Sequence, residues 1–220
     1  MLEHLKRQLL EAAVAAEQTG LCQHKSGNFS IRDKETGYVV VTPSGIERKQ
    51  LSHYEICVVD LDAKVIEALP GIKPTSELLM HLQIYRTRAD VHAIAHTHSK
   101  FATSFAVLNK EIPAIIYECA TMGLKEAVIP VAPYATPGTQ SLANHIIEPI
   151  KKSDAILLEK HGAVAVDITI KEALLKANYM EELAEIYYRT LVINGLEEPS
   201  RFSARELEAW RYPEEIKHHK

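Results

Sequence analysis

The stretch Val91-His92-Ala93-Ile94-Ala95-His96-Thr97-His98-Ser99 decides how this sequence is interpreted. It is an apolar run that ends with two histidines two residues apart. In a β-strand, residues i and i+2 point to the same face, so His96 and His98 could share a metal ion. One His-x-His pair among eleven histidines can also arise by chance. The interpretation therefore depends on whether other segments supply further ligands.

Two other segments do so. Residues 155–166 read as a short apolar strand, a His161-Gly162 turn and a second apolar strand, which places His161 at a strand end. Pro74-Thr75-Ser76-Glu77 opens an amphipathic helix with a carboxylate in its first turn. Three imidazoles and one carboxylate form a four-coordinate set suited to Zn²⁺ at about 2.0–2.2 Å. The predicted zinc ligands are thus Glu77, His96, His98 and His161, although cobalt or manganese could use the same set.

The bulk properties indicate one ordinary globular unit. A chain of 220 residues without repeat or linker predicts a single α/β domain over residues 1–220, with a polar, mobile tail from about residue 200. The composition is 46% apolar and 25% charged, with a net charge of −4. This balance gives no electrostatic reason to expect nucleic acid or an anionic membrane as the partner.

The sequence predicts that the protein is located in the cytoplasm. No apolar run approaches the roughly 20 residues that span a bilayer, and residues 1–7 read as the start of an amphipathic helix rather than a signal peptide. The three cysteines, Cys22, Cys57 and Cys119, are odd in number and lack a Cys-x-x-Cys pattern. Such usage favours reduced thiols over a disulfide framework.

Helical and strand patterns alternate along the chain. Helices are predicted over residues 2–19, 76–87, 100–108, 139–151 and 169–194, with a short one from Ser203. Strands or extended stretches are predicted over 38–42, 56–61, 65–68, 91–99, 112–118, 128–139, 155–158 and 162–166. The polar segment 216–220, with two adjacent histidines, reads as a solvated terminus.

Three small polar loops predict an anion-binding cradle. They contribute hydroxyls, glycine N–H groups and an amide, and one lies at a helix N-terminus, where unpaired N–H groups suit a phosphate oxygen. Each loop taken alone is also ordinary turn or capping chemistry. The predicted phosphate-binding residues are Gly27, Asn28, Ser44, Gly45, Thr75 and Ser76.

Taken in order, these motifs resemble the class II aldolase/adducin family over nearly the whole chain. The matching segments are Gly20-Leu21, Gly27-Asn28-Phe29-Ser30, Thr42-Pro43-Ser44-Gly45, Thr75-Ser76-Glu77, His96-Thr97-His98, residues 112–117, residues 132–136 and His161-Gly162. The resemblance implies a three-layer αβα fold around a largely antiparallel nine-stranded sheet. It also implies a C4 homotetramer whose active sites lie between subunits.

The resemblance further implies a reaction and residue roles. A ketose 1-phosphate, such as L-fuculose 1-phosphate, would be cleaved to dihydroxyacetone phosphate and a small aldehyde such as lactaldehyde. One Zn²⁺ per subunit would stabilise the enediolate as a Lewis acid. Glu77 would bind zinc at rest and then act as acid and base, and Tyr117 of a neighbouring subunit would protonate the aldehyde oxygen.

Other readings of the same scaffold stay open. A ribulose-5-phosphate 4-epimerase would use related retro-aldol chemistry. A methylthioribulose-1-phosphate dehydratase is a further alternative, because related dehydratases use a glutamate in this neighbourhood as a base, and Glu118 follows Tyr117. An adducin-like interaction module is the non-catalytic alternative, but a scaffold has no physical need for a converging ligand set. Lys25 either adds charge to the phosphate site or faces solvent.

Overall fold

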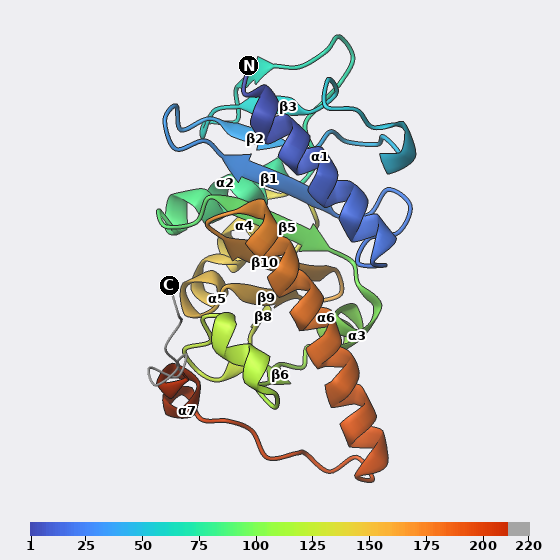
Figure 1. Ribbon diagram of the computed structural model, residues 1–220, viewed down its shortest axis with the longest axis vertical. Coiled ribbons are helices and arrows are strands. Elements are labelled where there is room, and N and C mark those ends of the chain that lie inside the picture. Colours follow the sequence, from blue (N-terminus) through green and yellow to red (C-terminus); the bar gives the residue numbers. More distant parts are fainter. Residues whose placement is uncertain (211–220) are drawn as a thin grey trace, which may run out of the picture.

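Eight strands from residues 28–167 form one sheet in the computed structural model, which describes residues 1–210 (Figure 1). All neighbouring strands are antiparallel except the last pair. From edge to edge the strands are β4 (Val65–Glu67), β3 (Cys57–Val59), β2 (Val39–Val41), β1 (Asn28–Arg32), β5 (Ala93–Thr97), β10 (Gly162–Asp167), β9 (Ala155–Leu158) and β8 (Val131–Ala132).

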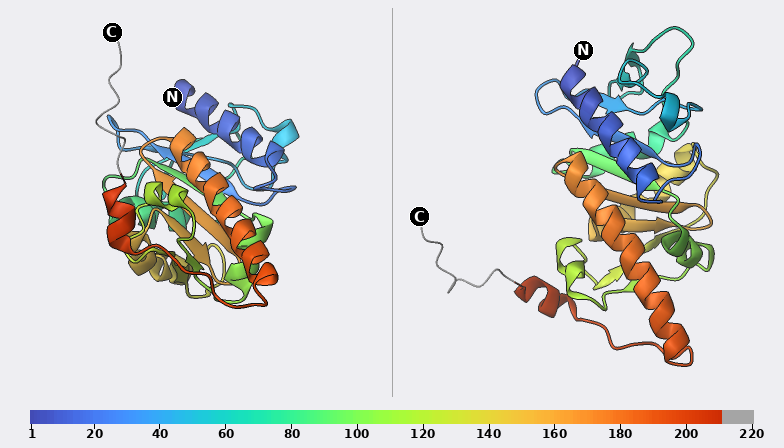
Figure 2. Two further views of the ribbon diagram at one scale, coloured as in Figure 1. Left: turned by 60° about the horizontal axis from the view of Figure 1, so that its bottom comes forward. Right: turned by 45° about the vertical axis from the view of Figure 1, so that its right-hand side comes forward.

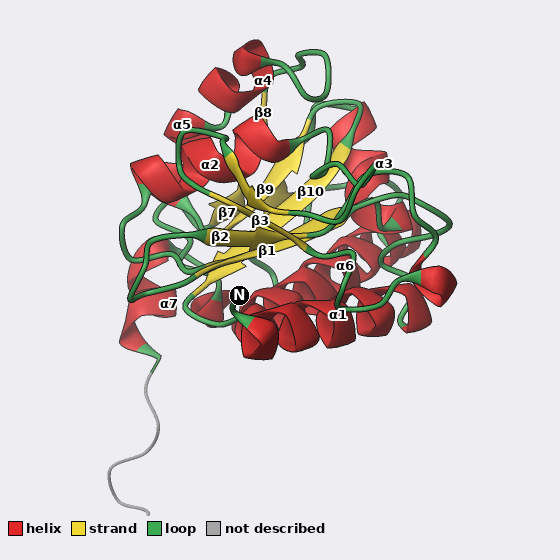
Figure 3. Ribbon diagram, turned by 90° about the horizontal axis from the view of Figure 1, so that it is seen from above, coloured by secondary structure: helices red, strands yellow, loops and turns green. Residues whose placement is uncertain are grey.

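Helices cover both faces of this sheet, so the molecule has three layers (Figure 3). One face carries α1 (Glu3–Gln18) and the long α6 (Ile170–Ile193), and the other carries α2 (Leu78–Thr87), α4 (Gln140–His145) and α5 (Ile147–Lys152). Figure 2 shows α1 and α6 running obliquely across their face. The helix α3 (Lys100–Val107) follows β5 directly, and α7 (Ala204–Ala209) ends the described chain.

Each face of the sheet has its own apolar core. Under α1 and α6 the helices present small side chains at helical spacing, for example Ala13, Ala16, Ala173 and Ala177, all fully buried. Small residues let these helices approach the strands closely. The opposite core joins α2, α4 and α5 to the other side of the same strands, through residues such as Leu82, Leu142, Ile150, Ile94 and Val164. Because successive side chains of a β-strand point to opposite faces of the sheet, the same strands contribute apolar residues to both cores.

The predicted three-layer, largely antiparallel architecture is confirmed. The main sheet has eight strands, and two further short strands, β6 (Ile112–Pro113) and β7 (Val128–Ile129), form a separate two-stranded sheet. Pro113 and Pro130 lie at these strands. Proline lacks the N–H that a longer ladder would need, which explains why these strands stay short.

The strand β1 was not predicted, because Gly27-Asn28-Phe29-Ser30 reads as a small polar loop. Three predicted boundaries also differ from the structure. Helix α2 begins at Leu78 and makes Glu77 its N-cap, so Glu77 is not in the first turn as predicted. The helix predicted over 139–151 is two helices separated at Ile146, because Pro149 cannot donate the hydrogen bond that would join them. The extended stretch predicted over 112–118 ends early, since Tyr117 and Glu118 begin the 3₁₀ helix η2 (Tyr117–Thr121).

The C-terminal predictions are met in part by the described chain. Ser203 and Glu206 form the reciprocal capping box of α7. The predicted solvated terminus at 216–220 lies outside the described residues. Among the helices that are described, none combines the length and the apolar character needed to cross a membrane.

Candidate metal centre and active site

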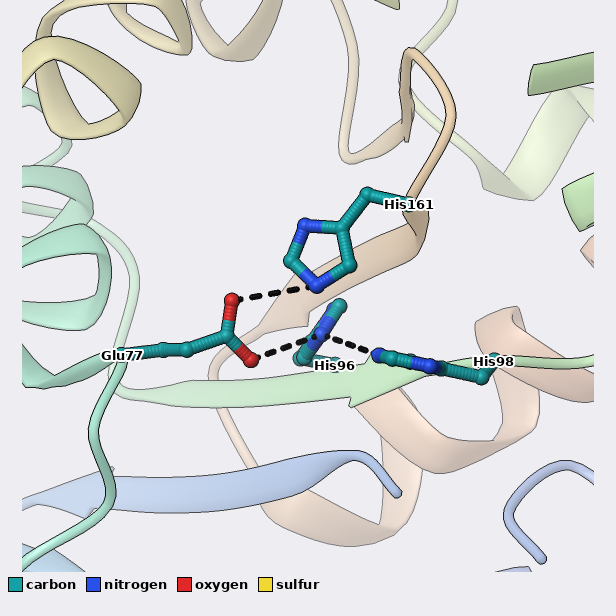
Figure 4. A group of neighbouring side chains, drawn as sticks. All are labelled: Glu77, His96, His98 and His161. Carbon is teal, nitrogen blue, oxygen red and sulfur yellow. Dashed lines mark hydrogen bonds and ion pairs between the residues drawn. The ribbon is translucent and has the colours of Figure 1, made fainter. Parts of the chain in front are cut away.

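Three neighbouring strands meet at one end of the sheet and bring the predicted ligands together. The strand β5 ends where β1 and β10 begin, with Asn28 and Val164 flanking His96 in the register. Ile94 packs into the core on the α2 side, so alternation turns His96 and then His98 toward the same side. His161 precedes β10, and Glu77 caps α2 at the same point (Figure 4).

The four side chains form one compact cluster in which one ligand atom from each lies within 4.8 Å of all the others. Nε2 of His96 lies 3.0 Å from Nε2 of His98 and 3.0 Å from Oε2 of Glu77. Oε1 of Glu77 lies 3.2 Å from Nε2 of His161. Four ligands about 2.1 Å from one tetrahedral ion would stand roughly 3.4 Å apart, close to this spacing.

The polar atoms of the cluster fit a cation at its centre. Nδ1 of His96 lies 2.9 Å from the Ala163 carbonyl oxygen and can donate to it, which leaves the Nε2 lone pair facing the cluster. Oε1 of Glu77 is buried without a hydrogen-bond partner of good geometry. Because an unpaired buried carboxylate oxygen is costly, its position among three imidazole nitrogens fits a metal ligand.

Two glycines allow the strands to approach this closely. A Cβ on Gly162 would collide with the Thr97 carbonyl oxygen, and it would lie 3.1 Å from Cδ2 of His98. A Cβ on Gly27, which has a φ of +73°, would lie 2.6 Å from the His96 carbonyl oxygen. The close approach of β10 to β5, and of the loop before β1 to β5, therefore requires glycine at both positions.

Burial and mutual charge set the protonation of the cluster without metal. Burial lowers the pKa of His98 to about 3 and that of His161 to about 4, and the nearby His96 adds to both effects. Burial opposes the charged forms of Glu77 and His96, but their mutual attraction outweighs it. The pKa of Glu77 is therefore lowered and that of His96 raised. Without metal the cluster thus offers neutral imidazoles at His98 and His161 and a carboxylate at Glu77, whereas His96 must give up a proton when a metal binds.

The three predicted phosphate loops lie side by side. The Thr75 N–H donates to the Thr42 carbonyl and the Ser44 N–H donates to the Lys73 carbonyl, so these two loops support one another. Ser44, Gly45 and Ser76 are exposed, while Thr75 is buried and its hydroxyl accepts from the Glu77 N–H. Gly27 and Gly45 line one small pocket together with Thr42, Lys25 and Arg48. Asn28 instead directs its amide at Glu77, with its Nδ2 2.8 Å from Oε2.

Sequence reasoning missed Arg48, which is buried in this region. Its guanidinium donates to the carbonyl oxygens of His24, Ser26 and Gly27, at 3.2, 2.5 and 3.0 Å. These bonds fix the loop that leads into β1. Arg48 lies in the charged run Glu47-Arg48-Lys49, which reads as a solvated surface. No sequence signal separated this buried arginine from its exposed neighbours.

Sequence reasoning also missed His81, one helical turn after Glu77. It is fully buried, and its ring contacts Asn28 and Ser30. Burial, and after it the charge of His96, lowers the pKa of His81 to about 3, so its imidazole is neutral. The spacing of four residues from Glu77 was the available signal, because it places both side chains on one helix face.

The structure does not bring Tyr117 to the cluster of its own chain. The Tyr117 side chain begins η2 and is 60% exposed. Within residues 1–210, its hydroxyl forms no hydrogen bond with any of the four predicted ligands. Glu118 follows it, and the Glu118 carbonyl accepts from the Thr121 hydroxyl.

Comparisons with known proteins agree with this arrangement. L-fuculose phosphate aldolase of Escherichia coli (strain K12) is 36% identical over 189 residues, covering 86% of this chain and 85% of that protein. The 5-deoxy-D-ribulose 1-phosphate aldolase of Bacillus thuringiensis serovar kurstaki is 39% identical over 190 residues, with the same coverage of 86% and 85%. These names confirm the predicted enzyme class, an aldolase.

A solved structure described as L-fuculose 1-phosphate aldolase has a TM-score of 0.86 at 32% identity, over 93% of both chains. The family pattern described as Class II Aldolase and Adducin N-terminal domain matches residues 7–188. The matched range contains the complete cluster of Glu77, His96, His98 and His161. The chain therefore belongs to the class II aldolase and adducin family.

Proposed function

We propose that this protein is a zinc-dependent aldolase that cleaves a ketose 1-phosphate to dihydroxyacetone phosphate and a small aldehyde. L-fuculose 1-phosphate, which would give lactaldehyde, and 5-deoxyribulose 1-phosphate are the first candidates, since relatives are named for both types of substrate. The observation that carries the proposal is the buried Glu77, His96, His98 and His161 cluster. A buried cluster of three imidazoles and one carboxylate has no packing role that apolar residues would not fill better.

The residues divide the chemistry between them. Glu77, His96, His98 and His161 would hold the metal, which supplies Lewis-acid stabilisation of the charge that develops at the ketone oxygen. Glu77 would move a proton at the carbon that becomes nucleophilic, as a general acid and base. The loop residues Gly27, Ser44, Gly45, Thr75 and Ser76 would bind the phosphate and thereby orient the reactive end of the substrate. Asn28 would add the second N–H of its amide, since the first donates to Glu77.

Tyr117 would complete the site from a neighbouring subunit of a homotetramer, by protonating the aldehyde oxygen. Its exposure, 60%, supports a role outside its own chain's cluster. Exposed apolar side chains gather near the C-terminal end of α6, and such patches commonly mark subunit contacts. They include Leu108, Tyr188, Val192, Ile193 and Leu196. We also propose a cytoplasmic location, which the three free, buried cysteines support.

A coupled assay tests the activity. Release of dihydroxyacetone phosphate from a panel of ketose 1-phosphates is measured with three protein samples. These are the protein as isolated, the protein after chelation, and the chelated protein after Zn²⁺, Co²⁺ or Mn²⁺ is restored. Release that is lost to the chelator and best recovered with zinc is the expected result, and the best substrate identifies the aldehyde. A metal-loaded protein that releases nothing from any substrate contradicts the aldolase. Parallel assays for 4-epimerisation and dehydration then identify the alternative chemistry. Inactivity in all of these assays favours the non-catalytic, adducin-like interaction module.

A further inference from the structure

A buried polar seam runs between β1 and α2, inside an otherwise apolar core. On β1, Asn28 and Ser30 are two residues apart and face α2. On α2 and its cap, Glu77, His81 and Tyr85 are four residues apart and face β1. Two residues of a strand advance about 6.6 Å and four residues of a helix about 6.0 Å. The polar side chains of β1 and those of α2 are therefore spaced almost equally and can contact one another along the seam.

The seam is almost completely shielded from water. Ser30 and His81 are fully buried, Tyr85 is 1% exposed, Glu77 5% and Asn28 7%. Buried polar groups that lack partners cost free energy, so each of these atoms must find a partner within the seam.

A continuous chain of hydrogen bonds meets this requirement. The Tyr85 hydroxyl lies 2.8 Å from Ser30 Oγ, and Ser30 Oγ lies 2.7 Å from His81 Nδ1. His81 Nε2 lies 2.5 Å from Asn28 Oδ1. Asn28 Nδ2 lies 2.8 Å from Glu77 Oε2. The chain therefore begins at a phenol in the core and ends at a predicted metal ligand.

The carboxylate at one end, together with the neutral ring of His81, fixes the direction of every bond. A carboxylate only accepts, so Asn28 must present its NH₂ group to Glu77 and its carbonyl oxygen to His81. His81 must then carry its proton on Nε2 and donate it to Asn28. Its bare Nδ1 accepts from the Ser30 hydroxyl, and Ser30 in turn accepts from Tyr85.

We infer that His81 is a positioning residue, which holds the Asn28 amide so that it donates to Glu77 and fixes that carboxylate among the three metal-binding histidines. This inference deepens the proposed function and rests on the metal site within it. Without the proton on His81 Nε2, the Asn28 amide can turn by 180° and present its oxygen to Glu77. Two oxygens would then face each other, and Glu77 would lose its fixed position.

The tautomer of His81 gives a direct test that needs no activity. In protein labelled with ¹⁵N-histidine, NMR at about pH 7 is expected to show a neutral His81 ring with its proton on Nε2. The His81→Gln variant identifies the signal by its absence. A neutral ring with its proton on Nδ1 overturns the inference, because Nε2 could then no longer donate to Asn28.

Two substitutions at position 81 separate positioning from packing. His81→Leu fills the space without a donor, whereas His81→Gln can place an N–H near the position of Nε2. For His81→Leu we expect zinc affinity to fall about 10- to 100-fold, as is typical when a partner of a metal ligand is lost. We expect kcat to fall by a larger factor than KM rises. His81→Gln should restore most of both.

His92→Leu is the matched control, because His92 is a partly buried histidine at the opposite end of β5 and outside the seam. Zinc affinity in His81→Leu equal to that in His92→Leu contradicts the inference, as does a folded His81→Gln that is no better than His81→Leu. If His81→Leu does not fold, Ser30→Ala takes its place. It is expected to weaken zinc binding by a smaller factor, and unchanged binding overturns the inference. Zinc affinity and tautomer decide the result even if no aldolase activity is found.

Discussion

Glu77 has two roles, because its backbone begins α2 and its carboxylate belongs to the histidine cluster. As the N-cap of α2 it gives its backbone carbonyl to the first helical turn, while its side chain makes no capping bond and points toward the histidines. Burial alone would raise the pKa of this carboxyl group. The neighbouring His96 and His161, with the Asn28 amide, outweigh burial and lower the pKa, so the group is a carboxylate that can bind metal or accept a proton.

Replacing Glu77 by glutamine tests its role as a proton carrier. The change keeps the volume of the side chain but removes a group that can exchange protons. We expect kcat for aldol cleavage to fall about 10²- to 10⁴-fold, the usual contribution of a general acid or base. Steady-state kinetics, with circular dichroism to confirm the fold, measure the effect. A Glu77→Gln enzyme with wild-type kcat removes Glu77 from the mechanism.

Glu118→Gln is the companion variant, because it separates the aldolase from the dehydratase. In the proposed aldolase Glu118 has no assigned role, and we expect dihydroxyacetone phosphate release to change less than about twofold, as is typical of a substitution outside the chemistry. A large loss in Glu118→Gln would instead favour the dehydratase reading.

At the scale of elements, the site is produced by the junction of β1, β5 and β10. Each strand contributes a residue near its end, and α2 contributes its cap. The N-terminus of α3, directly after His98, is held by Glu181 of α6, whose carboxylate accepts from the Phe101 and Ala102 N–H groups at 2.9 Å. The predicted ligands therefore lie on strand and helix ends, or within one residue of a strand end, rather than in long loops.

Gly162→Ala tests this junction. The added Cβ would collide with the Thr97 backbone and press on the His98 ring, so β10 must move away from β5. We expect a loss of about 1–3 kcal/mol in the free energy of unfolding, as for other overpacked sites, together with weaker zinc binding. Denaturant unfolding and zinc competition measure the two effects.

Gly195→Ala is the control for that experiment. Its Cβ would meet no atom within 4 Å, although its φ of +62° strains any residue with a side chain. It should lose stability without losing zinc affinity. Zinc affinity that stays unchanged in Gly162→Ala would show that the ligands do not depend on close packing of the two strands.

The sequence predicted most elements and the convergence of Glu77 with three histidines, because both follow from local periodicity, but it missed β1, whose first residues read as a polar loop. The two-residue strand period places His96 beside His98, and the apolar strands around His161-Gly162 place the third imidazole at a strand end. The start of α2 was missed because Ser76 and Glu77 are both acceptable first-turn residues, and only tertiary contacts turn Glu77 toward the histidines. Arg48 and His81 were missed because their partners lie 21–24 and 51–53 residues away in the chain.

At the scale of the whole molecule, the two apolar cores share one sheet, so neither face can open without exposing the strands of the other. This arrangement favours cooperative unfolding of the described chain. It also means that proton binding by the buried histidines is linked to the stability of the entire fold.

That linkage predicts how the stability of the metal-free protein depends on pH. In the folded state the pKa values of His81, His98 and His161 are lowered to about 3, 3 and 4, from 6.5. Between about pH 6.5 and pH 4 the unfolded chain therefore binds more protons at these positions, and stability falls as the pH falls. His96, whose pKa is raised, acts in the opposite direction, but it is one group against these three and His92, whose pKa burial also lowers.

We therefore expect the Tm of the metal-free protein to decrease from about pH 7 to about pH 4.5. In His81→Gln one of the three groups is gone, and the slope of the unfolding free energy should fall by up to about 1.4 kcal/mol per pH unit, the value for one proton. Chemical denaturation of the wild type and of His81→Gln at several pH values measures this slope. A Tm that stays constant or rises on acidification would mean that these imidazoles are protonated in the fold. Neutral imidazoles, and with them the ready-made metal ligands, would then be absent from the metal-free protein.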